Sequence, residues 1–177
     1  MITEFDETAW LTGFLSGGGN LQAQGMDRVR NFVFLWNIFE DVAMSKKAEI
    51  VKLAALADQI NGYFPYDAAD FTEYVDYFSN RYFNANGDKT YSIEGLKFRG
   101  TANDQAAKSL VEAVLTQQEQ NPVEIMKALL FIVYRFRNNL FHGEKQLVNI
   151  DGQVDNFIVA NNILRMVLEK MKTIGMF

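Results

Sequence analysis

The chain contains no cysteine, only one histidine and only two prolines in 177 residues. Without cysteine the protein can form neither a disulfide bond nor a thiolate metal site. With a single histidine, one protomer cannot assemble a metal site from several imidazoles. We therefore expect neither a bound metal nor another cofactor.

Long hydrophobic runs are also missing. The longest covers residues 128–134, whereas a membrane-spanning helix needs about 18 or more consecutive apolar residues. The first seven residues are acidic and lack the positive and apolar regions of a secretory signal. We therefore expect a cytoplasmic protein that makes no contact with a membrane.

Positive charge is scarce, since 17 lysines and arginines face 22 acidic residues and leave a net charge of −5. This balance counts against a protein that coats nucleic acid, because such binding relies on a wide basic surface. A small local basic site is still allowed. Hydrophobic residues make up 49% of the chain, which indicates one globular domain over residues 1–177 with a sizeable core.

Helical periodicity dominates what is present, because apolar residues recur three and four positions apart. It predicts an all-α, up-and-down bundle of five or six helices with short connections. Ser45 is expected to cap one helix, Thr101 or Asn103 another, and Asn121 with Pro122 should open the most apolar one. Besides a short helix at 7–15, the expected ranges of the longer helices are 27–44, 46–60, 67–83, 101–118, 123–141 and a last helix from 151–153 onward.

Three segments fit that pattern less simply. The glycine-rich residues 16–20 lack the spacing of a phosphate-binding loop and predict a flexible connection. Residues 84–100 interrupt the helical pattern, with a turn at 86–88 followed by either a small hairpin or an ordered loop. The aromatic stripe along 67–83 is typical of core packing, with base stacking as the alternative.

The most informative stretch is residues 134–145. The helix before it is apolar nearly all round, so it should be the central and most buried one. It ends by placing two arginines, two asparagines and the only histidine within eight residues. Burying such groups is costly unless they are paired, so they should cluster at the end of the bundle or at an interface.

Helix geometry limits how these residues combine. Arg135 and His142 are seven apart and share a helix face, with Asn138 and Asn139 between them. Arg137 and His142 are five apart and would point about 140° from each other on an ideal helix. They can meet on one ligand only if the helix ends before His142 or if two protomers contribute.

This pattern resembles the signature of the HEPN family of small nucleotide-associated helical bundles. The signature is an arginine, a polar residue, and a histidine separated from the arginine by four to six residues near the end of a long helix. Arg137, Asn138 and His142 fit with four residues between arginine and histidine, and Arg135 fits with six. Residues 34–40, with Trp36, resemble the tryptophan-bearing early helix of several HEPN groups. Residues 84–100 lie outside the minimal pattern.

The resemblance implies a homodimer in which motif residues of two protomers meet in a shared cleft. Many members are metal-independent RNA endonucleases, and many belong to toxin–antitoxin or antiviral systems with a cognate antitoxin or nucleotidyltransferase. Others bind RNA, a nucleotide or a partner protein without cutting. The resemblance therefore implies a ribonuclease, with a non-catalytic binding module as the alternative.

The residue types suit metal-free RNA cleavage. Histidine titrates near neutrality and can accept the proton of the ribose 2′-hydroxyl, while arginine offers a permanent charge and a planar donor fork to phosphate. A purely structural role is the alternative, because basic groups in a last helical turn stabilise the helix dipole by about 0.3–1 kcal/mol each. The candidate residues are Arg137, His142 and Asn138 for catalysis, Arg135, Asn139 and Lys145 for substrate binding, and Glu40 as a support that could pair with an arginine of the site.

Overall fold

The computed structural model describes residues 6–7, 9–10, 13, 23–141 and 151–177. Over these residues the all-α prediction is confirmed, with six helices of eleven residues or more and no strand. None of the described helices is both long and apolar enough to span a bilayer. The elements are α2 (Ala23–Met44), α3 (Ile50–Tyr63), η1 (Ala68–Phe71), α4 (Thr72–Tyr82), α5 (Tyr91–Glu94), α6 (Ala102–Leu115), α7 (Pro122–Phe141), η3 (Asp151–Gln153) and α8 (Val154–Thr173).

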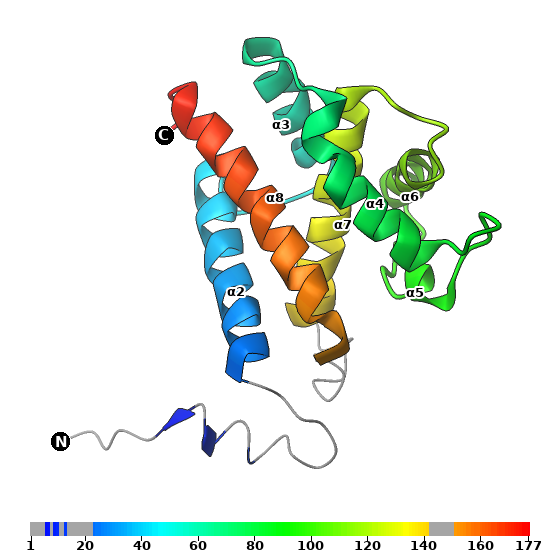
Figure 1. Cartoon of the computed structure of the whole chain (residues 1–177). Coiled ribbons are helices and arrows are strands. Elements are labelled where there is room, and N and C mark those ends of the chain that lie inside the picture. The colour runs from blue at the N-terminus through cyan, green and yellow to red at the C-terminus, as the bar shows by residue number, and fades with distance from the viewer. Residues whose placement is uncertain (1–5, 8, 11–12, 14–22, 142–150) are drawn as a thin grey trace.

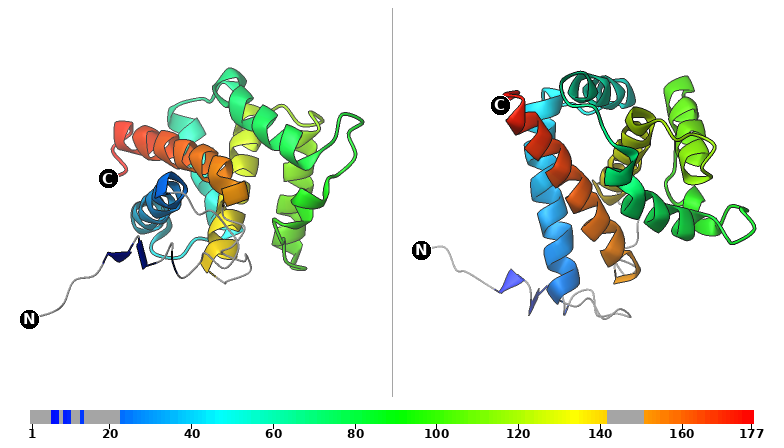
Figure 2. Two further views of the ribbon diagram at one scale, coloured as in Figure 1. Left: turned by 60° about the horizontal axis from the view of Figure 1, so that its bottom comes forward. Right: turned by 45° about the horizontal axis from the view of Figure 1, so that its top comes forward.

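Helix α7 lies in the middle of the molecule, with α2 and α8 on one side and α4 and α6 on the other (Figure 1). It packs chiefly against α3 and α6, and also against α4, η1 and α8. Residues 128–133 are all buried, so this helix presents no free face to water along that stretch. The prediction of a central, most buried helix is confirmed. Figure 2 shows α2 and α8 packed side by side along much of their length.

Two helix starts are set by the side chains that the sequence predicts. The Asn121 Oδ1 accepts a hydrogen bond from the backbone N–H of Val123 at 3.1 Å, and Pro122 is the first residue of α7. The Thr101 hydroxyl accepts the backbone N–H of Asp104 at 3.2 Å and caps α6. Each bond satisfies one of the amide groups that a helix leaves unpaired at its start.

The predicted cap at Ser45 is wrong, because α3 begins only at Ile50. Ser45 and Lys46 have φ angles of 51° and 64°, and the backbone N–H of Lys46 donates to the carbonyl of Glu40 at 2.9 Å. Left-handed residues with such a bond are typical of a helix C-terminus. The serine therefore ends α2 and does not start α3.

The segment after α4 is an ordered loop with one helical turn, so the hairpin alternative is wrong. The turn at 86–88 is present: Asn84 Oδ1 accepts the backbone N–H groups of Asn86 and Asp88, each at 2.9 Å. Residues 91–94 then form α5. Ile93 and Leu96 are both buried, and a spacing of three brings two side chains to one face of a helical turn but not of a strand.

The aromatic stripe of the fourth predicted helix packs in the core. Phe71, Phe78 and Tyr82 are buried, and the rings of Phe78 and Tyr82 stack with centroids 5.8 Å apart. This confirms core packing over base stacking for these rings. The helix predicted at 7–15 lies largely outside the described residues, and the loop predicted at 16–20 lies wholly outside them.

Candidate functional site

Arg137 lies one turn before the end of α7, at Phe141, and reaches across to α2. Its Nη2 lies 3.3 Å from Glu40 Oε2, and its Nη1 donates to Asn138 Oδ1 at 3.2 Å. The guanidinium also lies over the ring of Phe141, 5.2 Å from the ring centroid, a favourable cation–π arrangement. The side chain is 27% exposed. The arginine is thus held from three directions and still reaches the surface.

Glu40 joins three parts of the chain. It accepts the indole N–H of Trp36 at 3.0 Å and the backbone N–H of Ala48 at 3.0 Å, besides pairing with Arg137. Trp36 and Glu40 are four apart on α2, which places them on one face of the helix. The pairing of Glu40 with a site arginine, which the sequence allows, is present in the structure. Its value for function stays a prediction.

The guanidinium of Arg137 has one donor left over. Its Nε is buried and has no hydrogen-bond partner in the described part of the chain. Buried polar atoms are paired in most proteins, so an unpaired one calls for an explanation. A ligand oxygen arriving at this edge of the guanidinium is one explanation, because an ionised donor forms strong bonds to anionic oxygens.

The other polar residues of α7 are more deeply placed. Asn138 is buried and orients Arg137 through the bond just described. Arg135 is buried as well, where it donates to the carbonyls of Leu96, at 2.8 Å, and of Lys97. Its Nη1 lies 3.5 Å from Asp104 Oδ1. This arginine therefore fixes the segment after α5 against α7.

Asn139, like Arg135, holds the segment after α5 against α7. It is buried, and its Nδ2 donates to the carbonyl of Gly95 at 2.8 Å. Contact of Arg135 or Asn139 with a substrate stays a prediction. To bind a substrate, either side chain would have to give up hydrogen bonds that it already makes within the protomer.

The remaining predicted residues, His142 and Lys145, lie outside the described residues. The last residue of α7 is Phe141. The approach of His142 to Arg137 therefore stays a prediction, as does the composite site of two protomers.

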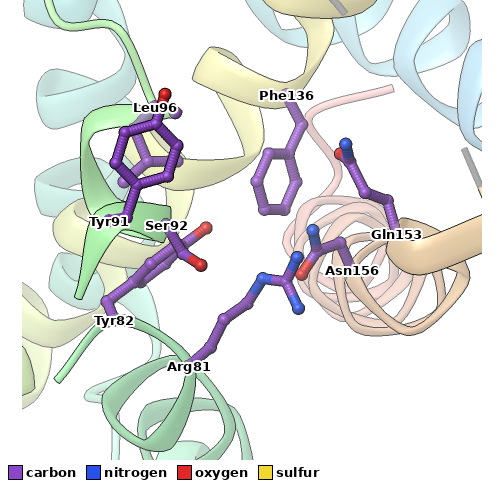
Figure 3. Close-up of a pocket in the computed structure, with 9 residues that line it drawn as sticks. Arg81, Tyr82, Tyr91, Ser92, Leu96, Phe136, Gln153 and Asn156 are labelled. Carbon is purple, nitrogen blue, oxygen red and sulfur yellow. The ribbon is translucent and has the colours of Figure 1, made fainter. Parts of the chain in front are cut away.

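The structure also shows a pocket that the sequence does not predict (Figure 3). It is lined by residues of α4, α5, α7, η3 and α8, among them Arg81, Tyr91, Phe136 and Asn156. These positions are distant in sequence and form no motif. The only local signal is Arg81, a lone basic residue in the last turn of α4.

Within the described residues, no three histidine, cysteine or carboxylate side chains lie close enough together to hold a metal ion. Comparison of the chain with models of protein families, with curated proteins and with solved structures gave no match in any of the three. The case for a function therefore depends on the residues of the site and their geometry.

Proposed function

We propose that this chain is a metal-independent RNA endonuclease of the HEPN type that acts as a homodimer. The observation that carries the proposal is the state of Arg137. The fold fixes its guanidinium with Glu40, Asn138 and Phe141, keeps it partly exposed, and leaves its Nε without a partner among the described residues. Such a pre-oriented cation suits a reaction in which charge develops on phosphate oxygens.

The chemistry follows from the residue types. His142 accepts the proton of a ribose 2′-hydroxyl, and the 2′-oxygen attacks the adjacent phosphorus. The bond from phosphorus to the 5′-oxygen breaks, and the leaving oxygen takes a proton from water. The products are a 2′,3′-cyclic phosphate and a 5′-hydroxyl. Arg137 stabilises the negative charge of the phosphorane, and Asn138 keeps the arginine in position.

In a dimer, an arginine and a histidine that point apart on one helix could meet across two protomers. Residues five apart on an ideal helix point about 140° apart, so Arg137 of one protomer would act with His142 of the partner subunit. The biological setting that the resemblance implies is a cytoplasmic toxin or antiviral system, with an antitoxin or a nucleotidyltransferase as the cognate partner.

One observation favours a second candidate, a HEPN-like dimer that binds RNA, a nucleotide or a partner protein without cutting it. The charge of Arg137 is already balanced by Glu40. A balanced cation attracts phosphate less strongly than a free one. The second candidate therefore predicts selective binding and no turnover.

The decisive experiment is digestion of single-stranded or looped RNA in EDTA. The wild type should cut, because unpaired RNA can align its 2′-hydroxyl with the leaving oxygen. His142→Ala should slow cleavage by about 10²–10⁴-fold, and Arg137→Ala should cost a comparable factor. Arg165→Ala is the matched control, since the ion pair of this exposed arginine among the described residues is with Glu169 on its own helix, and it should cut like the wild type.

Absence of cleavage by the wild type, or full activity of His142→Ala, would end the ribonuclease proposal. His142 is the only histidine, so its imidazole proton signals in NMR report the site without ambiguity. A shift of those signals on addition of RNA, without cleavage, would select the binding module.

A further inference from the structure

The pocket between α4, α5, α7 and α8 is called the Arg81 pocket below, after its charged residue. Its volume is about 210 Å³, below the roughly 300–1,000 Å³ of pockets for drug-sized ligands. Figure 3 shows the rings of Tyr91 and Phe136 on one side of this space. The guanidinium of Arg81 and the amide of Asn156 lie on the other. The pocket therefore has one aromatic wall and one hydrogen-bonding wall.

The charge of the pocket is positive. Arg81 is the only charged residue among the described residues that line it. Its Nη2 donates a long hydrogen bond to the carbonyl of Gly152 at 3.4 Å, and its guanidinium also interacts with the hydroxyls of Tyr77 and Tyr82. Within the described chain it forms no ion pair with a carboxylate. An arginine without a carboxylate partner at the edge of a pocket is suited to bind an anionic group bidentately.

Asn156 adds a second donor beside this charge. It is 2% exposed, and its Oδ1 accepts the hydroxyl of Tyr77 at 2.8 Å. Burial raises the pKa of Tyr77, so that hydroxyl stays protonated and keeps the amide oriented. Asn156 also lines the pocket beside Arg81. An amide held in one orientation on a pocket wall can donate its N–H groups to an acceptor on a ligand.

The aromatic wall is open to a flat ligand. Tyr91 is 95% exposed, although it belongs to the ordered turn α5. Phe136 is buried and also lines the pocket, and the hydroxyl-bearing Ser92 lines it beside Tyr91. Aromatic side chains next to a cation form the platforms on which nucleobases stack.

We propose that the Arg81 pocket binds one nucleotide, either free or as a unit of an RNA chain. The phosphate would bind Arg81, the base would stack on Tyr91, and the Asn156 amide would donate to a base or ribose oxygen. A nucleotide combines an anion, a flat ring and hydrogen-bond acceptors, which are the three features the pocket recognises. The proposal goes beyond the ribonuclease proposal and stands if the chain proves not to cut RNA.

Isothermal titration calorimetry of the full chain tests the pocket. The titrants are AMP, UMP, inorganic phosphate and a single-stranded RNA hexamer, the hexamer being titrated into the His142→Ala background so that it stays intact. Arg81→Gln should weaken binding by about tenfold or more, because it removes a charge-assisted bond. Tyr91→Ala should weaken it by about 5- to 100-fold through lost stacking. Tyr91→Phe and Arg165→Gln should bind like the wild type.

The outcomes distinguish binding of a free nucleotide from binding of a nucleotide within an RNA chain. Saturable binding of AMP or UMP that depends on Arg81 and Tyr91 supports a free nucleotide. The same dependence seen only with the hexamer supports a unit of RNA. Phosphate that binds as tightly as AMP overturns the nucleotide assignment, and so does binding that neither variant weakens. Absence of saturation by every titrant overturns the site altogether, whatever the cleavage assay shows.

Discussion

At the residue scale, the site depends on Glu40 as much as on Arg137. The carboxylate is partly buried, with the side chain 18% exposed, and it receives an indole N–H, a backbone N–H and a guanidinium. Without Glu40, each of these donors would lose its acceptor in a region with little access to water. A buried donor without a partner costs more free energy than a typical hydrogen bond contributes. Glu40 therefore stabilises the junction of α2, the loop before α3 and α7, and it orients the arginine at the same time.

Replacing Glu40 should reveal this double role. Glu40→Ala should lower the free energy of unfolding by about 1–3 kcal/mol, because Trp36 and Ala48 lose their acceptor. Asp41→Ala is the matched control, as it removes an exposed carboxylate from the next position of the same helix, and it should stay within about 0.5 kcal/mol of the wild type. Urea unfolding followed by tryptophan fluorescence measures both. Equal effects of the two variants would contradict the assigned role.

At the scale of the element, α7 connects the core to the site. Its middle is apolar on every face and is covered by helices on all sides, whereas its last two turns carry the polar residues. The buried part gives the helix a single position in the bundle, because a tightly packed interior leaves little freedom to shift. That position then determines where Arg137 meets α2.

Shortening a buried side chain of α7 should therefore lower the free energy of unfolding substantially. Leu129→Ala and Phe131→Ala each remove a buried side chain, and each should cost about 2–5 kcal/mol. Val51→Ala, on the exposed side of α3, removes atoms that are largely in water already and should cost under about 0.5 kcal/mol. Thermal melts followed by circular dichroism compare the three. Unchanged melting temperatures for both α7 variants would refute the central position of this helix.

At the scale of the whole molecule, the proposed composite site requires two protomers. Light scattering at micromolar concentration should give a mass near twice the 20.2 kDa of the chain. Phe141 is half exposed beside Arg137, and a shared cleft would bury its ring between protomers. Phe141→Ser should therefore shift the equilibrium toward monomer, whereas Tyr63→Ser, exposed at the end of α3, should not. A strict monomer at every concentration would exclude the composite site.

The fold as a whole should also lose stability at alkaline pH. Burial raises the pKa of Tyr66, Tyr74, Tyr77 and Tyr82 above the ordinary tyrosine value. Above pH about 10 the unfolded chain releases these protons while the native chain retains them, so rising pH favours unfolding. For the deeply buried Tyr82, the free energy of unfolding should fall by up to about 1.4 kcal/mol per pH unit in this range.

Urea unfolding at pH 8 to 11, with tyrosine ionisation followed by absorbance, measures this loss. Stability should be fully present below pH about 10 and should decrease above it. Tyr82→Phe should make the decrease less steep. A free energy of unfolding that is constant up to pH 11 would contradict the burial of these hydroxyl groups.

The helical class and several helix boundaries can be predicted from the amino-acid sequence, because they depend on contacts within a few residues. Thr101, Asn121 and Pro122 start their helices as their chemistry predicts. The apolar run before Arg135 also identified the central helix, since a helix without a polar face has to be buried. The cap predicted at Ser45 is wrong because Ser45 and Lys46 have a left-handed backbone that ends α2.

Which distant side chains meet depends on how the helices pack, and periodicity does not predict it. Arg137 and Glu40 are 97 positions apart in the sequence. They pair because the bundle brings the end of α7 close to α2. The Arg81 pocket likewise depends on how α4, α5, α7 and α8 pack, because its residues come from four separate segments of the chain. Arg135 and Asn139 share the motif with Arg137, yet helix rotation directs them to the carbonyls of residues 95–97. Periodicity tells which residues share a face, but the angle at which helices pack decides what that face contacts.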